Sequence, residues 1–115
     1  MRPIIFAVDF DGTLCTNAWP GIGEPNLDLI ARCRAWKADG HKLILYTMRE
    51  GPLLDEAVAW CRRFGIEFDA VNDNLPEMQA LYRNNPRKVF ANFYIDDHNA
   101  PDSVLGIYPP GTILT

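Results

Sequence analysis

The fold of this chain is decided by residues 4–14, which read Ile4-Ile5-Phe6-Ala7-Val8-Asp9-Phe10-Asp11-Gly12-Thr13-Leu14. The first five are apolar and predict a strand that is buried on both faces, as in a parallel sheet. Asp9 and Asp11 follow it. Because strand side chains alternate, we expect both to point the same way, roughly 6–7 Å apart along the chain at about 3.3 Å per residue. Gly12 permits a sharp turn, and we expect the Thr13 hydroxyl to bond back to the backbone of that turn.

Two carboxylates at the end of a parallel strand lie where open α/β sheets bind their ligands. Like charges this close resist joint ionisation unless a cation, a proton or a cationic side chain joins them. The pair therefore predicts a metal ion, with one carboxylate as nucleophile and the other as acid and base. On its own, an Asp-x-Asp-Gly turn is more often just a polar cap on a strand, so this interpretation depends on the rest of the sequence.

The composition is that of an ordinary globular domain. The 115 residues are 48% hydrophobic and 23% charged, which predicts a single domain spanning residues 1–115 with its own core. The net charge of −4 gives no basic field, so generic nucleic-acid binding is not indicated. A phosphorylated substrate would have to be attracted locally, by a metal ion and a few Lys or Arg side chains.

Three cysteines without a CxxC pair indicate reduced thiols in a cytoplasmic protein and neither a disulfide framework nor a zinc site. Cys33 and Cys61 fall on apolar helix faces and are predicted core residues. Cys15 lies just past the acidic turn and is a candidate for oxidation. No signal peptide or transmembrane run is visible, so no membrane partner is expected.

Strands alternate with helices along the chain. This order predicts an α/β fold with an open, mainly parallel sheet and helices on both faces, a Rossmann-like arrangement. After the first strand, the patterns predict a helix capped by Asn26 and ended by Gly40, a strand at 43–46, a helix from Pro52 to Gly65, a strand at 66–71, a helix at 76–82 and a strand at 93–95.

Polar residues cluster directly after each predicted strand. In a parallel sheet these strand ends share one edge, so positions far apart in sequence would converge there. Taken singly, each has an ordinary explanation as a turn residue or a surface charge, and His41 and His98 are predicted to be surface residues. The clusters are Asp9/Asp11, Thr47-Met48-Arg49, Asn72-Asp73-Asn74 and Asp96-Asp97-His98-Asn99.

In this order the clusters resemble the haloacid dehalogenase superfamily, the magnesium-dependent aspartyl phosphatases and phosphotransferases. The segment from Asp9 to Leu14 matches its first motif and Thr47 its second. Lys88 matches the basic third motif, although Arg87 is adjacent, and Asp96-Asp97 matches the acidic fourth. The match covers nearly the whole chain. No segment is long enough for a cap domain, so the chain is similar to the small capless branch.

The resemblance implies a role for each matched residue. Asp9 would be the nucleophile, and Asp11 would protonate the leaving oxygen and then deprotonate water. Thr47 would donate a hydrogen bond to the phosphoryl group, and Lys88 would offset its charge. Mg²⁺ would bind Asp9, the carbonyl of Asp11 and a carboxylate of Asp96-Asp97, with Asp97 favoured as the direct ligand. Beyond the matched residues, substrate contacts are expected from side chains predicted to lie at the same sheet edge, which are Met48, Arg49, Asn72 and Asn74.

The expected function is magnesium-dependent hydrolysis of a phosphomonoester through an aspartyl-phosphate. A phosphotransferase, or a non-catalytic phosphate-binding or receiver-like module, is the alternative. A receiver is disfavoured because it carries its phosphorylated Asp after the third strand, where this chain has Asn72. A capless site should be open. We therefore expect either a large substrate or a homo-oligomer, with the apolar residues of the loop Cys15–Glu24 as the contact surface.

Overall fold

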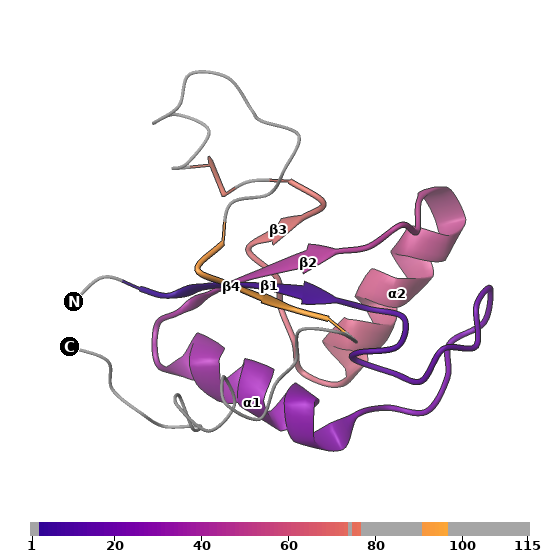
Figure 1. Ribbon diagram of the computed structural model, residues 1–115, viewed down its shortest axis with the longest axis horizontal. Coiled ribbons are helices and arrows are strands. Elements are labelled where there is room, and N and C mark those ends of the chain that lie inside the picture. The colour runs from indigo at the N-terminus through magenta and orange to yellow at the C-terminus, as the bar shows by residue number, and fades with distance from the viewer. Residues whose placement is uncertain (1–2, 74, 77–90, 97–115) are drawn as a thin grey trace.

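The computed structural model describes residues 3–73, 75–76 and 91–96 (Figure 1). Its sheet has the order β3-β2-β1-β4, and every pair of neighbours is parallel. β1 has a strand on each side, and its side chains from Ile5 to Val8 are buried on both faces of the sheet, which explains its continuous apolar run. The predicted α/β fold with a parallel, Rossmann-like sheet is confirmed. The elements are β1 (Ile5–Asp9), α1 (Leu27–Ala38), β2 (Lys42–Tyr46), α2 (Gly51–Arg63), β3 (Ala70–Val71) and β4 (Phe93–Ile95).

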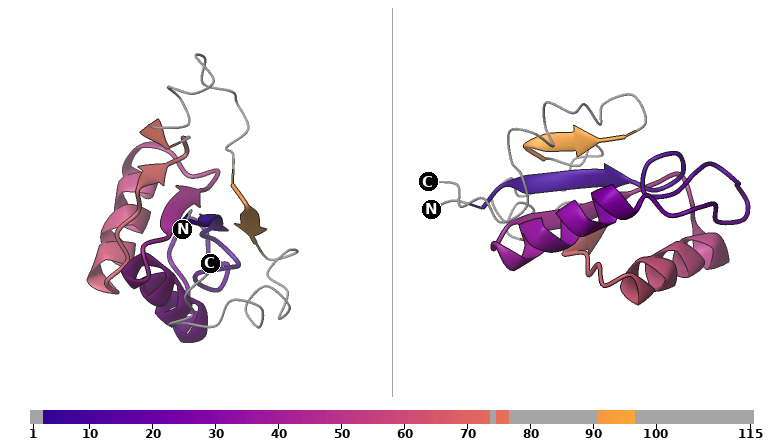
Figure 2. Two further views of the ribbon diagram at one scale, coloured as in Figure 1. Left: turned by 90° about the vertical axis from the view of Figure 1, so that its left-hand side faces the viewer. Right: turned by 90° about the horizontal axis from the view of Figure 1, so that it is seen from below.

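Both described helices lie on the same face of the sheet (Figure 2). Phe6 and Val8 of β1 point to this face, where the Phe6 ring stacks on Trp36 of α1 with 4.0 Å between ring centroids. Residues of the opposite parity, such as Ala7, pack on the other face with Leu75 and Ala91. The helix predicted at 76–82, which would cover that second face, lies outside the described residues apart from Pro76. Helices on both faces thus stay a prediction.

The ends of α1 follow the sequence signals. Asn26 is the N-cap, and its Oδ1 accepts a hydrogen bond from the Leu29 amide at 3.2 Å. Its Nδ2 donates to the Thr13 carbonyl at 3.1 Å, which ties the start of α1 to the acidic turn. The helix ends at Ala38, before Gly40 as predicted.

The strand predicted at 66–71 is wrong at residues 66–69, because β3 is only Ala70–Val71. The Ile66 amide donates to the Cys61 carbonyl, so this residue belongs to the end of α2. The Asp69 amide donates to the Leu43 carbonyl at 2.8 Å, but the Leu43 amide donates to the Asp69 carboxylate, also at 2.8 Å, and not to a backbone carbonyl. This side-chain hydrogen bond takes the place of strand pairing before Ala70, so β3 begins later than predicted.

Two further residues differ from expectation. His41 is buried, with 3% of its surface exposed, because its Nδ1 accepts a hydrogen bond from the Ile4 amide at 3.0 Å. Trp60, which the sequence analysis does not list among the core residues, is also buried and meets the Phe10 ring edge-on at 5.4 Å. His98 lies outside the described residues.

The three cysteines are buried and free. The core positions predicted for Cys33 and Cys61 are confirmed. Burial raises the pKa of the Cys61 thiol to about 12 and also raises the pKa of Cys15. Burial and a raised pKa both argue against Cys15 as an oxidation site. Within the described ranges, no helix is long and apolar enough to cross a membrane.

Candidate functional site

The carboxyl ends of the four strands meet at one edge of the sheet, as the clusters predicted. The register pairs Asp9 with Tyr46, and it pairs Val8 with Ile95, so Asp96 follows β4 beside Asp9. Thr47 follows β2 and Asn72 follows β3 at the same edge. Residues from all four clusters are thus brought together by the parallel sheet.

The acidic turn is wound tightly around the Phe10 carbonyl. That oxygen accepts hydrogen bonds from the amides of Thr13 at 3.1 Å and Leu14 at 3.0 Å, and Gly12 takes a φ of +82° that favours glycine. The prediction that the Thr13 hydroxyl bonds to the backbone of the turn is wrong. Its Oγ1 is buried without a hydrogen-bond partner among the described residues, and the Thr13 amide bonds to the turn instead.

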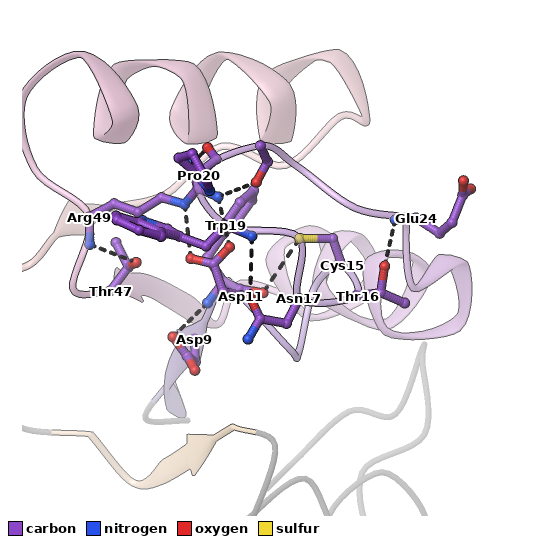
Figure 3. A network of polar contacts seen from close by, with 12 residues as sticks. Asp9, Asp11, Cys15, Thr16, Asn17, Trp19, Pro20, Glu24, Thr47 and Arg49 are labelled. Carbon is purple, nitrogen blue, oxygen red and sulfur yellow. Dashed lines mark hydrogen bonds and ion pairs between the residues drawn. The ribbon is translucent and has the colours of Figure 1, made fainter.

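Asp9 and Asp11 do not point the same way. The carboxylate of Asp11 points toward Arg49, whereas that of Asp9 points away from Asp11 and accepts a hydrogen bond from the Phe10 amide at 2.8 Å (Figure 3). The sequence prediction fails because β1 ends at Asp9, so strand alternation does not reach Asp11. In this structure the cation beside Asp11 is a guanidinium.

Arg49 is 2% exposed and lies against Asp11. Its Nε donates to Asp11 Oδ2 at 2.9 Å, and its Nη2 donates to Asp11 Oδ1 at 2.7 Å. The hydrogen bond to Asp11 raises the pKa of Arg49, so the side chain stays cationic. The interpretation of Arg49 as a surface charge is therefore wrong, whereas direct contact with substrate stays a prediction.

Thr47 is positioned from two sides. Its amide donates to Asn72 Oδ1 at 2.7 Å, and its Oγ1 accepts a hydrogen bond from the Arg49 amide at 3.1 Å. Because the hydroxyl oxygen accepts this bond, its proton is the group that can be donated to a ligand. Asn72 has a φ of +52°, a left-handed conformation that Asn tolerates better than most residues. Met48 is 99% exposed at the same edge.

Replacing Asn72 with Ala should lower the free energy of unfolding by about 1–2 kcal/mol. The variant loses the acceptor for the Thr47 amide and places a Cβ in a left-handed conformation. Asn72→Gly is the matched control, because glycine lacks the same acceptor but accepts the positive φ at no steric cost. Urea unfolding should show the larger loss for Ala. Equal losses of stability in the two variants would mean that the left-handed conformation of residue 72 contributes nothing to the effect.

The oxygen atoms at this edge are of the chemical type that hard divalent cations prefer. Asp9 and Asp96 bring carboxylate oxygens from neighbouring strands, and the Tyr46 hydroxyl donates to Asp96 Oδ2 at 3.1 Å. Arg49 engages the side chain of Asp11, so the backbone carbonyl is the Asp11 group suited to a metal. No group of three His, Cys, Asp or Glu residues able to hold a metal occurs among the described residues. The predicted site residues Asn74, Lys88 and Asp97 lie outside them.

The loop of residues 16–24, named the 16–24 loop, stands next to the acidic turn. Its ends are joined because the Thr16 amide donates to the Glu24 carbonyl and the Glu24 amide donates to Thr16 Oγ1, both at 2.8 Å. A side chain on Gly23 would place its Cβ 2.2 Å from Thr16 Oγ1, so this close approach requires glycine. Trp19 is 60% exposed, whereas Ile22 packs against the core. Between β1 and α1 the chain forms no inserted helix or strand.

One solved structure is clearly similar to this one. It is described as that of a conserved protein of Bacteroides thetaiotaomicron, with a TM-score of 0.76 and 41% sequence identity. The match covers 85% of this chain and 78% of that chain. No protein-family model matches the sequence, and a comparison with curated proteins finds no match. The description of the Bacteroides protein states no activity.

Proposed function

The chain belongs to the same family as the conserved protein of Bacteroides thetaiotaomicron, and we propose that it is a magnesium-dependent phosphatase of the haloacid dehalogenase type. The observation that supports this proposal is the convergence of Asp9, Asp11, Thr47 and Asp96 at the carboxyl edge of one parallel sheet. These are the residue types that aspartyl phosphate chemistry requires, in the order that the resemblance predicts. Because its three cysteines are free and buried, we propose that the protein works in the cytoplasm, where thiols stay reduced.

In the proposed reaction, a carboxylate oxygen of Asp9 forms a bond to phosphorus while the bond to the leaving oxygen breaks. Asp11 gives the leaving oxygen a proton and later takes one from the water that cleaves the aspartyl-phosphate. Each carboxylate oxygen has two acceptor sites, so the bonds from Arg49 leave one on each oxygen of Asp11 for this exchange.

The remaining groups stabilise the transferred phosphoryl group. The Thr47 hydroxyl donates a hydrogen bond to it, and Lys88 offsets its negative charge. Asp9 and a carboxylate of Asp96-Asp97 would hold Mg²⁺, and the ion would supply further positive charge at the phosphoryl oxygens. Fixed charges and donors of this kind contribute most of phosphoryl-transfer catalysis.

A panel of phosphorylated compounds tests the proposal. It should contain nucleotides, sugar phosphates and oligonucleotide ends, and release of inorganic phosphate should be measured with and without Mg²⁺. We expect at least one compound to be hydrolysed only when Mg²⁺ is present. Large substrates are included because the described residues form no cap over the site and Trp19 is exposed beside it. An exposed Trp19 also suits contact with a second copy of the chain. If no compound in the panel released phosphate, the proposed hydrolase activity would be rejected.

Asp97→Ala should abolish Mg²⁺ binding in calorimetric titration, because the resemblance makes this carboxylate the direct partner of Asp9. Asp28→Ala is the matched control, since Asp28 is a carboxylate on α1 whose side chain is 73% exposed. Its loss should leave Mg²⁺ affinity unchanged. If Asp97→Ala kept the affinity of the original protein, Asp97 would be removed from the ligand set and Asp96 would take its place.

A further inference from the structure

We propose that Arg49 is a positioning residue that couples the 16–24 loop to the carboxylate of Asp11. The functional consequence rests on the proposed phosphatase, in which Asp11 is the acid and base. The mechanical coupling rests on the contacts of Arg49 alone, so the two can be tested separately.

The guanidinium of Arg49 holds two parts of the chain at once. One side makes the paired bonds to Asp11 at 2.7 and 2.9 Å. The other side donates from Nη1 to the Pro20 carbonyl at 3.2 Å and from Nη2 to the Gly21 carbonyl at 2.6 Å (Figure 3). A planar fork of donors can satisfy a carboxylate and two carbonyls together, whereas the single ammonium of Lys cannot match this geometry. The acid/base carboxylate and the loop are therefore bonded through one side chain.

The position of the guanidinium is itself fixed by the core. It lies over the Phe10 ring at 5.0 Å, and that ring meets Trp60 of α2 edge-on. The side chain of Arg49 is fully buried, with 0% exposed, and the Arg49 amide donates to Thr47 Oγ1. A buried cation cannot replace a lost partner with bulk water, so each acceptor it loses is costly.

Coupling through Arg49 has to act in both directions. A loop that moves takes two carbonyls away from the guanidinium and weakens the hold on Asp11. By the same linkage, a change at Asp11 loosens the loop. A substrate or partner that contacts the loop at Trp19 would therefore change the orientation of Asp11. In the proposed reaction, this is how contacts outside the phosphoryl site can adjust the acid/base group.

Amide hydrogen exchange, measured by NMR on the whole chain, tests the coupling without any assumption about activity. The readouts are the amides of Thr16 and Glu24, whose mutual bonds close the loop. Arg49→Met, Arg49→Lys and Asp11→Asn should each speed their exchange about tenfold, because each loosens the unit that holds the loop. Arg62→Met is the control, since the side chain of Arg62 is 66% exposed on α2. It should leave both amides unchanged.

The decisive variant is Asp11→Asn, because it leaves Arg49 and every residue of the 16–24 loop unchanged and weakens only the bonds between Asp11 and Arg49. Unchanged exchange at Thr16 and Glu24 in this variant, with the protein folded, would overturn the coupling. If Arg49→Met fails to fold, Arg49→Lys and Asp11→Asn carry the test. Because these variants also lower global stability, the loop amides are compared with the amides of α1. An equal or larger increase in exchange across α1 would signal general loss of stability alone and would overturn a specific coupling.

A double-mutant cycle tests the functional consequence on the best substrate of the phosphate panel. Arg49→Lys should lower kcat about tenfold in the original protein but less than about twofold when Asp11 is already Asn. A merely structural role would give the same loss in both backgrounds, and that result would overturn positioning through Asp11. Complete lack of phosphate release in the original protein would reject the proposed function, while the exchange measurement would still decide the coupling.

Discussion

Replacing Asp9 with Asn is expected to abolish turnover, a loss of more than about 10⁴-fold on the best substrate of the panel. The amide oxygen of Asn is uncharged and cannot form a stable bond to phosphorus. The substitution is otherwise conservative, because the Asn oxygen can still accept the hydrogen bond that Asp9 Oδ1 receives from the Phe10 amide at 2.8 Å. Steady-state phosphate release and mass spectrometry of the trapped intermediate measure the effect.

Asp28→Asn makes the same chemical change at an exposed position on α1 and should keep full activity. Urea unfolding of Asp9→Asn should show little change in stability, which separates loss of the nucleophile from loss of the fold. Activity equal to that of the original protein in Asp9→Asn would mean that another residue attacks phosphorus, and the role of β1 in the chemistry would have to be reassigned.

The convergence of the site could be predicted because it depends on topology more than on detail. The continuous apolar run from Ile5 to Val8 indicates a strand that is buried on both faces, and the alternation of strands with helices indicates a parallel sheet. Once the strands are parallel, Asp9, Thr47 and Asp96 must share one edge. The two ends of α1 could also be predicted, since Asn26 caps its start and Gly40 follows its end.

The contacts of Arg49 could not be predicted, because they depend on how a loop folds across the sheet edge. The carbonyls of Pro20 and Gly21 are far from Arg49 in sequence, and backbone acceptors leave no pattern in the residue types. The predicted direction of the Asp11 side chain was wrong for a related reason. The strand ends at Asp9, so the turn alone orients Asp11. A signal was available in Phe10, an aromatic residue between two carboxylates that lies under the buried cation.

Asp11→Asn should slow turnover by roughly 10²–10⁴-fold, which is the usual contribution of general acid and base catalysis. The loss should be greatest for substrates with poor leaving groups, because these depend most on protonation of the leaving oxygen. A series of aryl and alkyl phosphates measures this dependence. Equal losses across the series would indicate that Asp11 does not act on the leaving group.

The same substitution should also lower the free energy of unfolding by about 1–3 kcal/mol, since it leaves buried Arg49 without its counter-charge. We expect a loss of stability at the lower end of the range usual for broken buried ion pairs. The side chain of Asp11 is 20% exposed, so water can reach it. An Asn at position 11 offers one acceptor, and its NH₂ group faces the donors of the guanidinium. Arg49→Lys supplies the comparison: it should cost similar stability, measured by urea unfolding, but only about tenfold in kcat. If Asp11→Asn lost stability and kept its turnover, Asp11 would be the partner of Arg49 alone, and the proton transfers would have to be assigned to another group.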